Sequence, residues 1–419
     1  MNGATTSGEL RAHNRVRLLR AVHDCGATST RSRLTRDLGL ARGTASVLVA
    51  GLADDELLHE EPAPEHARGR PTQVPGPHPR GPLALAADVR EDAWELAACE
   101  LGGRVTVLDV RPHDGTPQGA LAPLGEAVAA HTSRLGHRVV GVGVALAGPV
   151  RFGGLVDIAH LGWRSVNVPA LLGLSRSPGD APREGAGEVT VGNDTAFAAL
   201  AEARRGRLRG VRVGLHLHVD FDLGGVLVVE GRPLGGASGT GAEFGHMPLD
   251  GGDRPCMCGA IGCWGMDVGA NALLRHVGME HGGGRGREQA ERVLATSEEA
   301  VAAGAAALGR GIAALVNAHD PEVVTLSGHG VELAERAGGT LLRACEPRLM
   351  AIRRDPPPRI EGSALGWRGA LLGAMESVFD AFLTPEGLER WRENHPDQGR
   401  DTPERRNVTH STPQGDKPL

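Results

Sequence analysis

Three closely spaced cysteines constrain this chain more than any other feature of its sequence. The stretch CMCGAIGCWG at 256–265 holds Cys256, Cys258 and Cys263, which are three of only six cysteines in the chain. One disulfide among them would leave an odd thiol, and three unliganded thiols in a surface loop would oxidise readily. Structural zinc takes four nitrogen or sulfur ligands, and His246 lies ten residues before the first cysteine. The spacing therefore favours one structural Zn2+ per chain, held by His246 and the three cysteines.

Length and charge exclude several classes of protein. A chain of 419 residues has room for two or more folding units. Its net charge of −6 argues against a surface that binds nucleic acid all over. The first twenty residues lack the apolar core of a secretory signal, and we expect no membrane-spanning segment. We therefore expect a cytoplasmic protein with no membrane partner.

The N-terminal region has the opposite charge balance. Residues 10–50 carry eight arginines against two aspartates, which is typical of a DNA-binding segment. Apolar spacing predicts a helix over 10–22, a short helix capped by Ser29 or Thr30 and a second short helix over 41–53. A hairpin that would form the wing is expected after the second short helix. Val47 is expected in the packed face of these helices. The order of elements predicts a winged helix-turn-helix over residues 1–75, although an ordinary helical cap would share the pattern. The DNA contacts are expected from Arg42, Thr44 and Ser46 in the second short helix and from Arg68 and Arg70 in the wing.

The rest of the chain divides into three parts. A proline-rich linker is expected at 76–82. From Leu83 to residue 385, short apolar runs alternate with alanine-rich helical stretches, which predicts an α/β architecture. Residues 386–419 are polar and lack apolar periodicity, so we expect a disordered tail.

The combination of a winged helix-turn-helix with GTGAEFGHMPLDGGDRPCMCGAIGCWG resembles the ROK family of sugar kinases and sugar-responsive repressors. The resemblance implies an actin-like (ribonuclease H-like) α/β fold, with two lobes around a sugar cleft and a zinc loop over 246–263. It also implies that His246, Cys256, Cys258 and Cys263 hold the zinc, and that the chain forms homodimers or homotetramers.

The resemblance also implies a set of sugar-binding residues. GND at 192–194 matches the family motif whose asparagine holds the sugar and whose aspartate faces the hydroxyl that kinases phosphorylate. AHLGW at 159–163 matches another sugar-contacting segment, with histidine where asparagine is usual. Asn193 and Asp194 would alternatively serve only to cap the following helix. The expected effector site comprises His160, Asn193, Asp194, Glu243 and His246.

Two departures from the family pattern argue against phosphoryl transfer, and a third bears on which sugar the cleft accepts. The usual D-x-G-G-T phosphate loop is replaced by Asp88-Val89-Arg90-Glu91-Asp92, and the usual G-T-G-x-G by VDFDLGG, which contains Asp220 and Asp222. Carboxylates at both places repel phosphate. The family's glutamate after the last cysteine is also absent, because Trp264-Gly265 stands there.

The sequence therefore predicts a regulator and no enzyme. We expect a DNA-binding transcriptional repressor of carbohydrate metabolism, whose binding to double-stranded operator DNA is modulated by a sugar or sugar phosphate. Two alternatives stay open: an effector-independent regulator with a decayed pocket, and an ATP-dependent sugar kinase that carries a DNA-binding arm.

Overall fold

The N-terminal region folds into three helices and a small antiparallel sheet. The computed structural model describes residues 7–63, 72–174, 188–249, 252–279 and 286–394. The elements are α1 (Ser7–Asp24), α2 (Arg31–Asp37), α3 (Arg42–Asp54), β1 (Leu58–Pro62) and β2 (Gln73–Pro77). Thr30 caps α2 by accepting a hydrogen bond from the Arg33 amide, and Gly39 makes the following turn at a φ of +65°. This is the order of elements expected of a winged helix-turn-helix.

The proline-rich segment differs from the linker predicted at 76–82. Residues 73–77 pair with 58–62 in antiparallel register, so the second strand of the wing runs two residues past the boundary expected at residue 75. Proline is tolerated here because each strand of a two-stranded sheet has one free edge. Arg68 and Arg70, which were expected to make DNA contacts from the wing, lie outside the described residues.

The first lobe is built on a five-stranded sheet of order β10-β6-β3-β4-β5. Its strands are β3 (Leu83–Val89), β4 (Ala93–Glu100), β5 (Val105–Pro112), β6 (Val139–Leu146) and β10 (Glu188–Asn193). A three-stranded sheet of β7 (Val150–Arg151), β8 (Leu155–Ile158) and β9 (Trp163–Asn167) lies beside it. The helices of this lobe are α4 (Pro117–Leu135), α5 (Val168–Leu171), α6 (Asp194–Arg205) and, from the far end of the chain, α11 (Gly369–Phe382).

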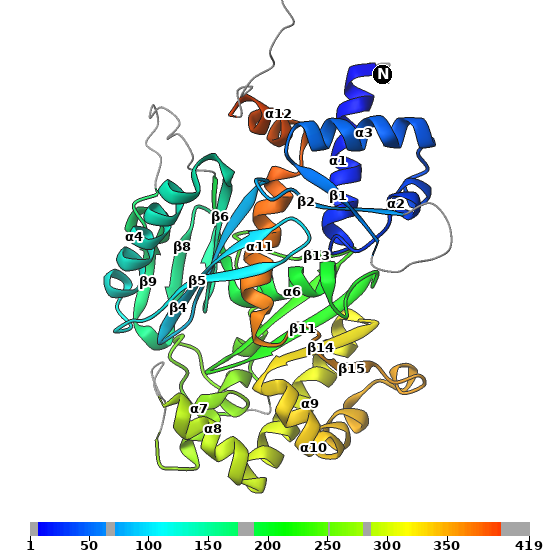
Figure 1. Cartoon of the computed structure of the whole chain (residues 1–419). Helices are drawn as coiled ribbons and strands as arrows, with labels where there is room; N and C mark the ends of the chain where they lie inside the picture. The colour runs from blue at the N-terminus through cyan, green and yellow to red at the C-terminus, as the bar shows by residue number, and fades with distance from the viewer. Residues whose placement is uncertain (1–6, 64–71, 175–187, 250–251, 280–285, 395–419) are drawn as a thin grey trace, which may run out of the picture.

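The second lobe repeats the plan with a sheet of order β13-β12-β11-β14-β15. Its strands are β11 (Val213–Val219), β12 (Leu223–Val229), β13 (Arg232–Pro233), β14 (Val323–Gly328) and β15 (Arg359–Gly362). Its helices are α7 (Ala270–Arg275), α8 (Arg287–Thr296), α9 (Glu298–His319) and α10 (His329–Cys345). Helix α9 is long and apolar enough to cross a membrane, but two thirds of its most apolar window (67%) is buried within the protein. It is a core helix of this lobe (Figure 1).

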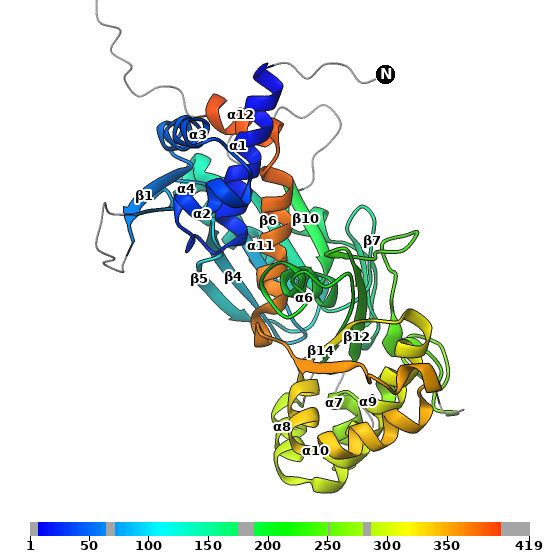
Figure 2. The same cartoon turned by 90° about the vertical axis from the view of Figure 1, so that its right-hand side faces the viewer.

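The helical N-terminal region packs directly on the first lobe. One apolar cluster joins Leu18 and Leu19 of α1 to Ala84 of β3 and to Phe379 of α11, and both views show α1 beside α11 (Figures 1 and 2). Helix α12 (Pro385–Glu393) closes this cluster with buried Leu388 and Trp391. The prediction of disorder from residue 386 is therefore wrong as far as Glu393. Only two apolar residues, three positions apart, bind α12 to its neighbours, which is too few to show as periodicity. Residues 395–419 lie outside the described part.

A buried polar cluster ties α1 to α6 and α11. The Glu376 carboxylate accepts from His23 Nε2 at 3.0 Å and also pairs with the Arg205 guanidinium. The other ring nitrogen of His23 accepts a hydrogen bond from the Gly102 amide at 3.1 Å. Both His23 and Glu376 are at most 1% exposed. Since α6 begins at Asp194, directly after β10, and ends at Arg205, which donates to the His23 carbonyl, this one helix connects the carboxyl end of β10 to the N-terminal module.

Candidate functional site

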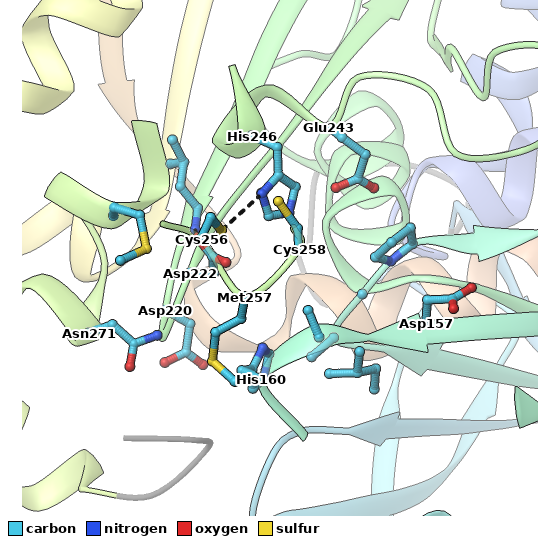
Figure 3. Close-up of a pocket in the computed structure, with 18 of the residues that line it drawn as sticks. Asp157, His160, Asp220, Asp222, Glu243, His246, Cys256, Met257, Cys258 and Asn271 are labelled. Carbon is cyan, nitrogen blue, oxygen red and sulfur yellow. Dashed lines mark hydrogen bonds between the residues drawn. The ribbon is translucent and has the colours of Figure 1, made fainter. Parts of the chain in front are cut away.

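A cavity of about 680 Å3 lies between the two lobes. His160, Asn193 and Asp194 line it from the first lobe, and Glu243 and His246 line it from the second. All five residues of the expected effector site therefore line one cavity. Figure 3 shows His160, Glu243 and His246 around it. Their convergence follows from the fold, because Asn193 and Asp194 stand at the carboxyl end of β10, which pairs in parallel with β6.

Asn193 and Asp194 begin α6. The side-chain oxygen of Asn193 accepts from the Ala196 amide at 2.9 Å, and its amide nitrogen donates to the Gly148 carbonyl at 3.0 Å. Each end of this side chain thus already has a partner, and Asn193 serves as the helix cap that the sequence left as an alternative. Asp194 accepts from the amide and hydroxyl of Thr195, both through Oδ1. Burial, with the nearby Glu91 carboxylate, raises the pKa of Asp194 to about 7.

Glu243 faces Asp194 across the cavity from the opposite lobe. Burial, together with the charges of Asp194 and Asp222, raises the pKa of Glu243 to about 7. Among the described residues, no arginine, lysine or histidine lies within ion-pair distance of Asp194, Asp222 or Glu243. Unpaired carboxylates aimed into a cavity suit a ligand that donates several hydrogen bonds.

The His246 and cysteine cluster has the spacing of a tetrahedral metal site. The ligand atoms of His246, Cys256, Cys258 and Cys263 lie within 4.8 Å of one another. Cys258 Sγ and Cys263 Sγ are 3.7 Å apart. Cys256 Sγ lies 3.8 Å from His246 Nδ1, the contact drawn as a dashed line in Figure 3. A sulfur pair at 3.7 Å is far too long for a disulfide, whereas bonds of about 2.3 Å from zinc to two sulfurs set them about 3.8 Å apart in a tetrahedron. The four side chains can hold a metal ion through four protein atoms.

An arginine that the sequence analysis did not single out occupies the side of the cleft where the phosphate loops were expected. Arg287, the first residue of α8, donates to both oxygens of Asp220 at 2.8 and 3.1 Å. Its guanidinium also lies 3.5 Å from Glu91 and 3.6 Å from Asp92 in the β3–β4 turn. Since Glu91 and Asp92 belong to the first lobe and Asp220 and Arg287 to the second, these four residues form an ionic clasp between the lobes.

The environment of the clasp is largely closed to water. The side chains of Glu91 and Asp220 are 4% and 11% exposed, and the guanidinium of Arg287 stacks over the rings of Phe221 and Trp367. Burial works against the charge on Asp220, but Arg287 lowers its pKa overall.

The clasp also touches the effector site. His160 Nε2 lies 3.4 Å from Glu91. Burial opposes the charge on His160, but the Glu91 carboxylate raises its pKa overall.

Comparison with known proteins assigns the chain. The pattern of the ROK family matches residues 103–380, which is well over half of the chain. The chain belongs to the ROK family.

Its ROK relatives include both kinases and regulators. It is 28% identical over 200 residues to a glucokinase of Streptomyces coelicolor, covering 46% of this chain and 58% of that enzyme. The chain thus spans less than two thirds of the length of that relative. It is 26% identical over 268 residues to the xylose repressor of Caldicellulosiruptor bescii, covering 59% of this chain and 64% of the repressor.

Solved ROK structures share the fold. A ROK family transcriptional regulator described as a homologue of the E. coli MLC protein matches with a TM-score of 0.64 and 21% identity, over 91% of this chain and 99% of that one. A ROK glucokinase from Streptomyces griseus, in complex with glucose and AMPPNP, matches with a TM-score of 0.59 and 23% identity, over 71% and 99%. The predicted actin-like α/β fold, preceded by a helical N-terminal region, is confirmed.

The expected DNA-contacting residues of this ROK protein lie on an open face of α3. Arg42, Thr44 and Ser46 are all exposed. Val47 is 57% exposed and does not lie in the core as predicted, because Ala45, Leu48, Val49 and Leu52 form the buried stripe.

Proposed function

We propose that this chain is a cytoplasmic transcriptional repressor whose DNA binding is modulated by a sugar or sugar phosphate in the inter-lobe cleft, without sugar kinase activity. One observation carries the proposal: α6 starts in the cleft at Asp194 and ends at Arg205, in the buried cluster that holds α1 of the helix-turn-helix. A ligand that shifts Asp194 would move the far end of the same rigid element. Such coupling requires the ligand to bind the DNA-competent and DNA-free arrangements with different affinity.

The ionic clasp supports the absence of kinase activity. In-line phosphoryl transfer needs donors that cradle the phosphates of ATP. Here Glu91, Asp92 and Asp220 place carboxylates on that side of the cleft, and Arg287 is already engaged by all three. We infer that a nucleotide phosphate would meet repulsion in place of a cradle.

Zinc has a structural part in this proposal. We infer that His246, Cys256, Cys258 and Cys263 hold one Zn2+ per chain with no position left for substrate. The ion would hold the loop that carries Met257 and Cys258 against the cavity, next to Glu243. The proposed assembly is a homodimer or homotetramer on a two-fold operator.

DNA binding is tested on the full chain, because the N-terminal module shares its core with the first lobe. Selection from randomised duplexes would give a bound sequence, and fluorescence anisotropy would give its affinity. Arg42→Ala is expected to weaken binding by roughly 5–150-fold, equal to about 1–3 kcal/mol, and to relax sequence preference. Arg343→Ala on α10 removes the same charge far from α3 and serves as the control. Equal losses in both variants would contradict the assignment of α3.

The effector site is tested with Asp194→Asn. We expect at least tenfold weaker binding of the effector, because a carboxylate–hydroxyl bond in a buried site contributes about 1.5–3 kcal/mol. DNA affinity without effector should stay nearly unchanged. Equal effector affinity in wild type and variant would remove Asp194 from the site, and binding of no sugar at all would favour a regulator with a decayed pocket.

A sugar kinase is the second candidate, and the 28% identical glucokinase of Streptomyces coelicolor favours it. An ATP-coupled assay across glucose, N-acetylglucosamine and xylose separates the two. Turnover by the wild-type chain that is lost in Asp194→Asn would establish the kinase and overturn the proposed absence of activity.

A further inference from the structure

A glycine beside the zinc cluster makes room for a carboxylate that enters the cleft. Gly265 is buried, and a Cβ added to it would lie 2.0 Å from Asp222 Oδ1. No side chain other than hydrogen fits at 265 while Asp222 keeps its position. Asp222 therefore occupies the space that any larger residue at 265 would take.

Asp222 lies where it can meet a ligand. It lines the cavity and stands in the β11–β12 turn near Cys256 and His246 (Figure 3). The Leu223 amide donates to its Oδ1 at 2.9 Å, which fixes the carboxylate locally. The negative charge of Asp222 favours the protonated forms of both Glu243, in the second lobe, and His160, in the first lobe. Asp222 therefore lies close enough to act on both sides of the cleft.

The charges around the cavity leave an acidic excess. Asp157 is paired with Arg151, and Asp220 and Glu91 with Arg287. On the cationic side, Arg254 and Arg275 share Asp267.

Within the described part of the chain, one arginine that lines the cavity bonds only to carbonyl groups. Arg164 donates to the backbone oxygens of Trp163 and Met257. Among the described residues that line the cavity, this leaves three carboxylates without a cationic partner, against the single guanidinium of Arg164.

We infer that Asp222 is a third ligand-binding carboxylate beside Asp194 and Glu243, and that the cleft takes an uncharged polyhydroxylated ligand, a sugar that carries no phosphate ester. The inference rests on the proposed function only in requiring that the cleft bind an effector. Three carboxylates accept hydrogen bonds from several hydroxyls at once, and hydroxyls bring no charge into the acidic cavity. A phosphate ester brings about −1.5 to −2 charges at pH 7 and no donor at that pH for a carboxylate.

The ligand class is tested by calorimetry on the full chain at constant ionic strength. The probes are glucose, N-acetylglucosamine and xylose, and the 6-phosphates of the first two. At least one neutral sugar is expected to bind, and a phosphate ester is expected to bind at least tenfold more weakly than its parent sugar. Tighter binding of an ester would overturn the inference and leave the proposed function standing. Binding of no probe would overturn both.

The role of Asp222 is tested with two variants that act differently. Asp222→Asn keeps the shape but removes the charge, and Gly265→Ala keeps the charge but displaces the carboxylate; each is expected to weaken sugar binding at least tenfold. The matched control for Asp222→Asn is Asp253→Asn, because Asp253 is an exposed aspartate in the segment just before Cys256. The matched control for Gly265→Ala is Gly252→Ala, where an added Cβ meets only ordinary contacts, the nearest at 3.6 Å. Unchanged affinity in Asp222→Asn would remove Asp222 from the site, whatever Gly265→Ala does to folding.

Discussion

Replacing Arg287 with methionine should cost far more stability than replacing an arginine of equal exposure elsewhere. The side chain of Arg287 is 22% exposed, yet its partners Glu91 and Asp220 are 4% and 11% exposed. Methionine retains some packing against Phe221 but leaves these two carboxylates without an arginine. Of the described residues, only histidines then lie within ion-pair distance, His160 of Glu91 and His329 of Asp220. Removing one partner of a buried ion pair typically costs about 3–5 kcal/mol, because the remaining charge is uncompensated.

Arg336 provides the matched control. Its side chain is 25% exposed, but its partners Glu298 and Glu332 are 91% and 43% exposed. Ion pairs with exposed partners contribute about 0–1 kcal/mol, so Arg336→Met should change stability little.

The assay is urea unfolding followed by tryptophan fluorescence. Trp367 stacks near Arg287 and reports on the clasp itself. With a urea slope near 3 kcal/mol per molar, the loss corresponds to a fall in the midpoint of roughly 1–2 M for Arg287→Met.

The pH dependence follows from the pKa of Asp220. Arg287 lowers this pKa in the folded protein, so the ion pair adds stability above the unfolded pKa near 4 and loses it as the pH falls through the lower folded value. The difference between Arg287→Met and wild type should therefore be large at pH 8 and should shrink as the pH falls below about 4.

A second substitution tests the cause of the loss. Adding Asp220→Asn to Arg287→Met removes one uncompensated charge and should restore part of the stability at pH 8. The reasoning is refuted if Arg287→Met costs no more than Arg336→Met, or if Asp220→Asn makes the first variant worse.

Three further outcomes are expected. Metal analysis of protein purified without chelator should find one zinc per chain, and Cys258→Ser should lower both the zinc content and the melting temperature; wild-type protein without zinc would contradict the site. Burial raises the pKa of Asp194 to about 7, so the folded state holds a proton that the unfolded state releases near pH 4. The stability of the ligand-free protein should therefore fall as the pH rises from 4 to 7. Asp194→Asn should flatten this slope in thermal melts, and an unchanged slope would show that other groups cause it. Trp391 donates to the Asp55 carbonyl at 2.7 Å and is buried against the N-terminal helical region. Trp391→Ala should therefore cost about 3–5 kcal/mol in urea unfolding, whereas a chain ended after Glu393 should melt like wild type.

Local patterns were enough to predict much of this molecule. The three cysteines and His246 lie within a short span, so their spacing alone predicts a cluster, and the structure brings their ligand atoms within 4.8 Å. The helices of the N-terminal module and most strands of both lobes follow from periodicity and from caps such as Thr30. Zinc itself, the DNA contacts and the effector remain predictions.

Segments held by few contacts were beyond sequence reasoning. The strand β2 was predicted only as far as residue 75, and Gly76 and Pro77 extend it because β1 lies beside them. Helix α12 is ordered because Leu388 and Trp391 pack against α1 and α11. Val47 was predicted to be buried because it is apolar and lies in a short helix. Only the tertiary packing determines which face of that helix is buried, and Val47 lies on the exposed face.

The sequence by itself determined the family resemblance, the two-lobed α/β plan, the composition of the metal cluster and the absence of glycine-rich phosphate loops. Only the tertiary structure decided what stands where those loops were expected. Arg287 is separated by 67 residues from Asp220 and by nearly 200 from Glu91, and no local pattern marks it as their partner. The same holds for Gly265 and Asp222, since the space between two residues 43 positions apart is a property of the folded chain. Both features depend on how segments far apart in the sequence pack against one another. Only the packing of the whole folded chain determines which charges pair and which side chains compete for the same space.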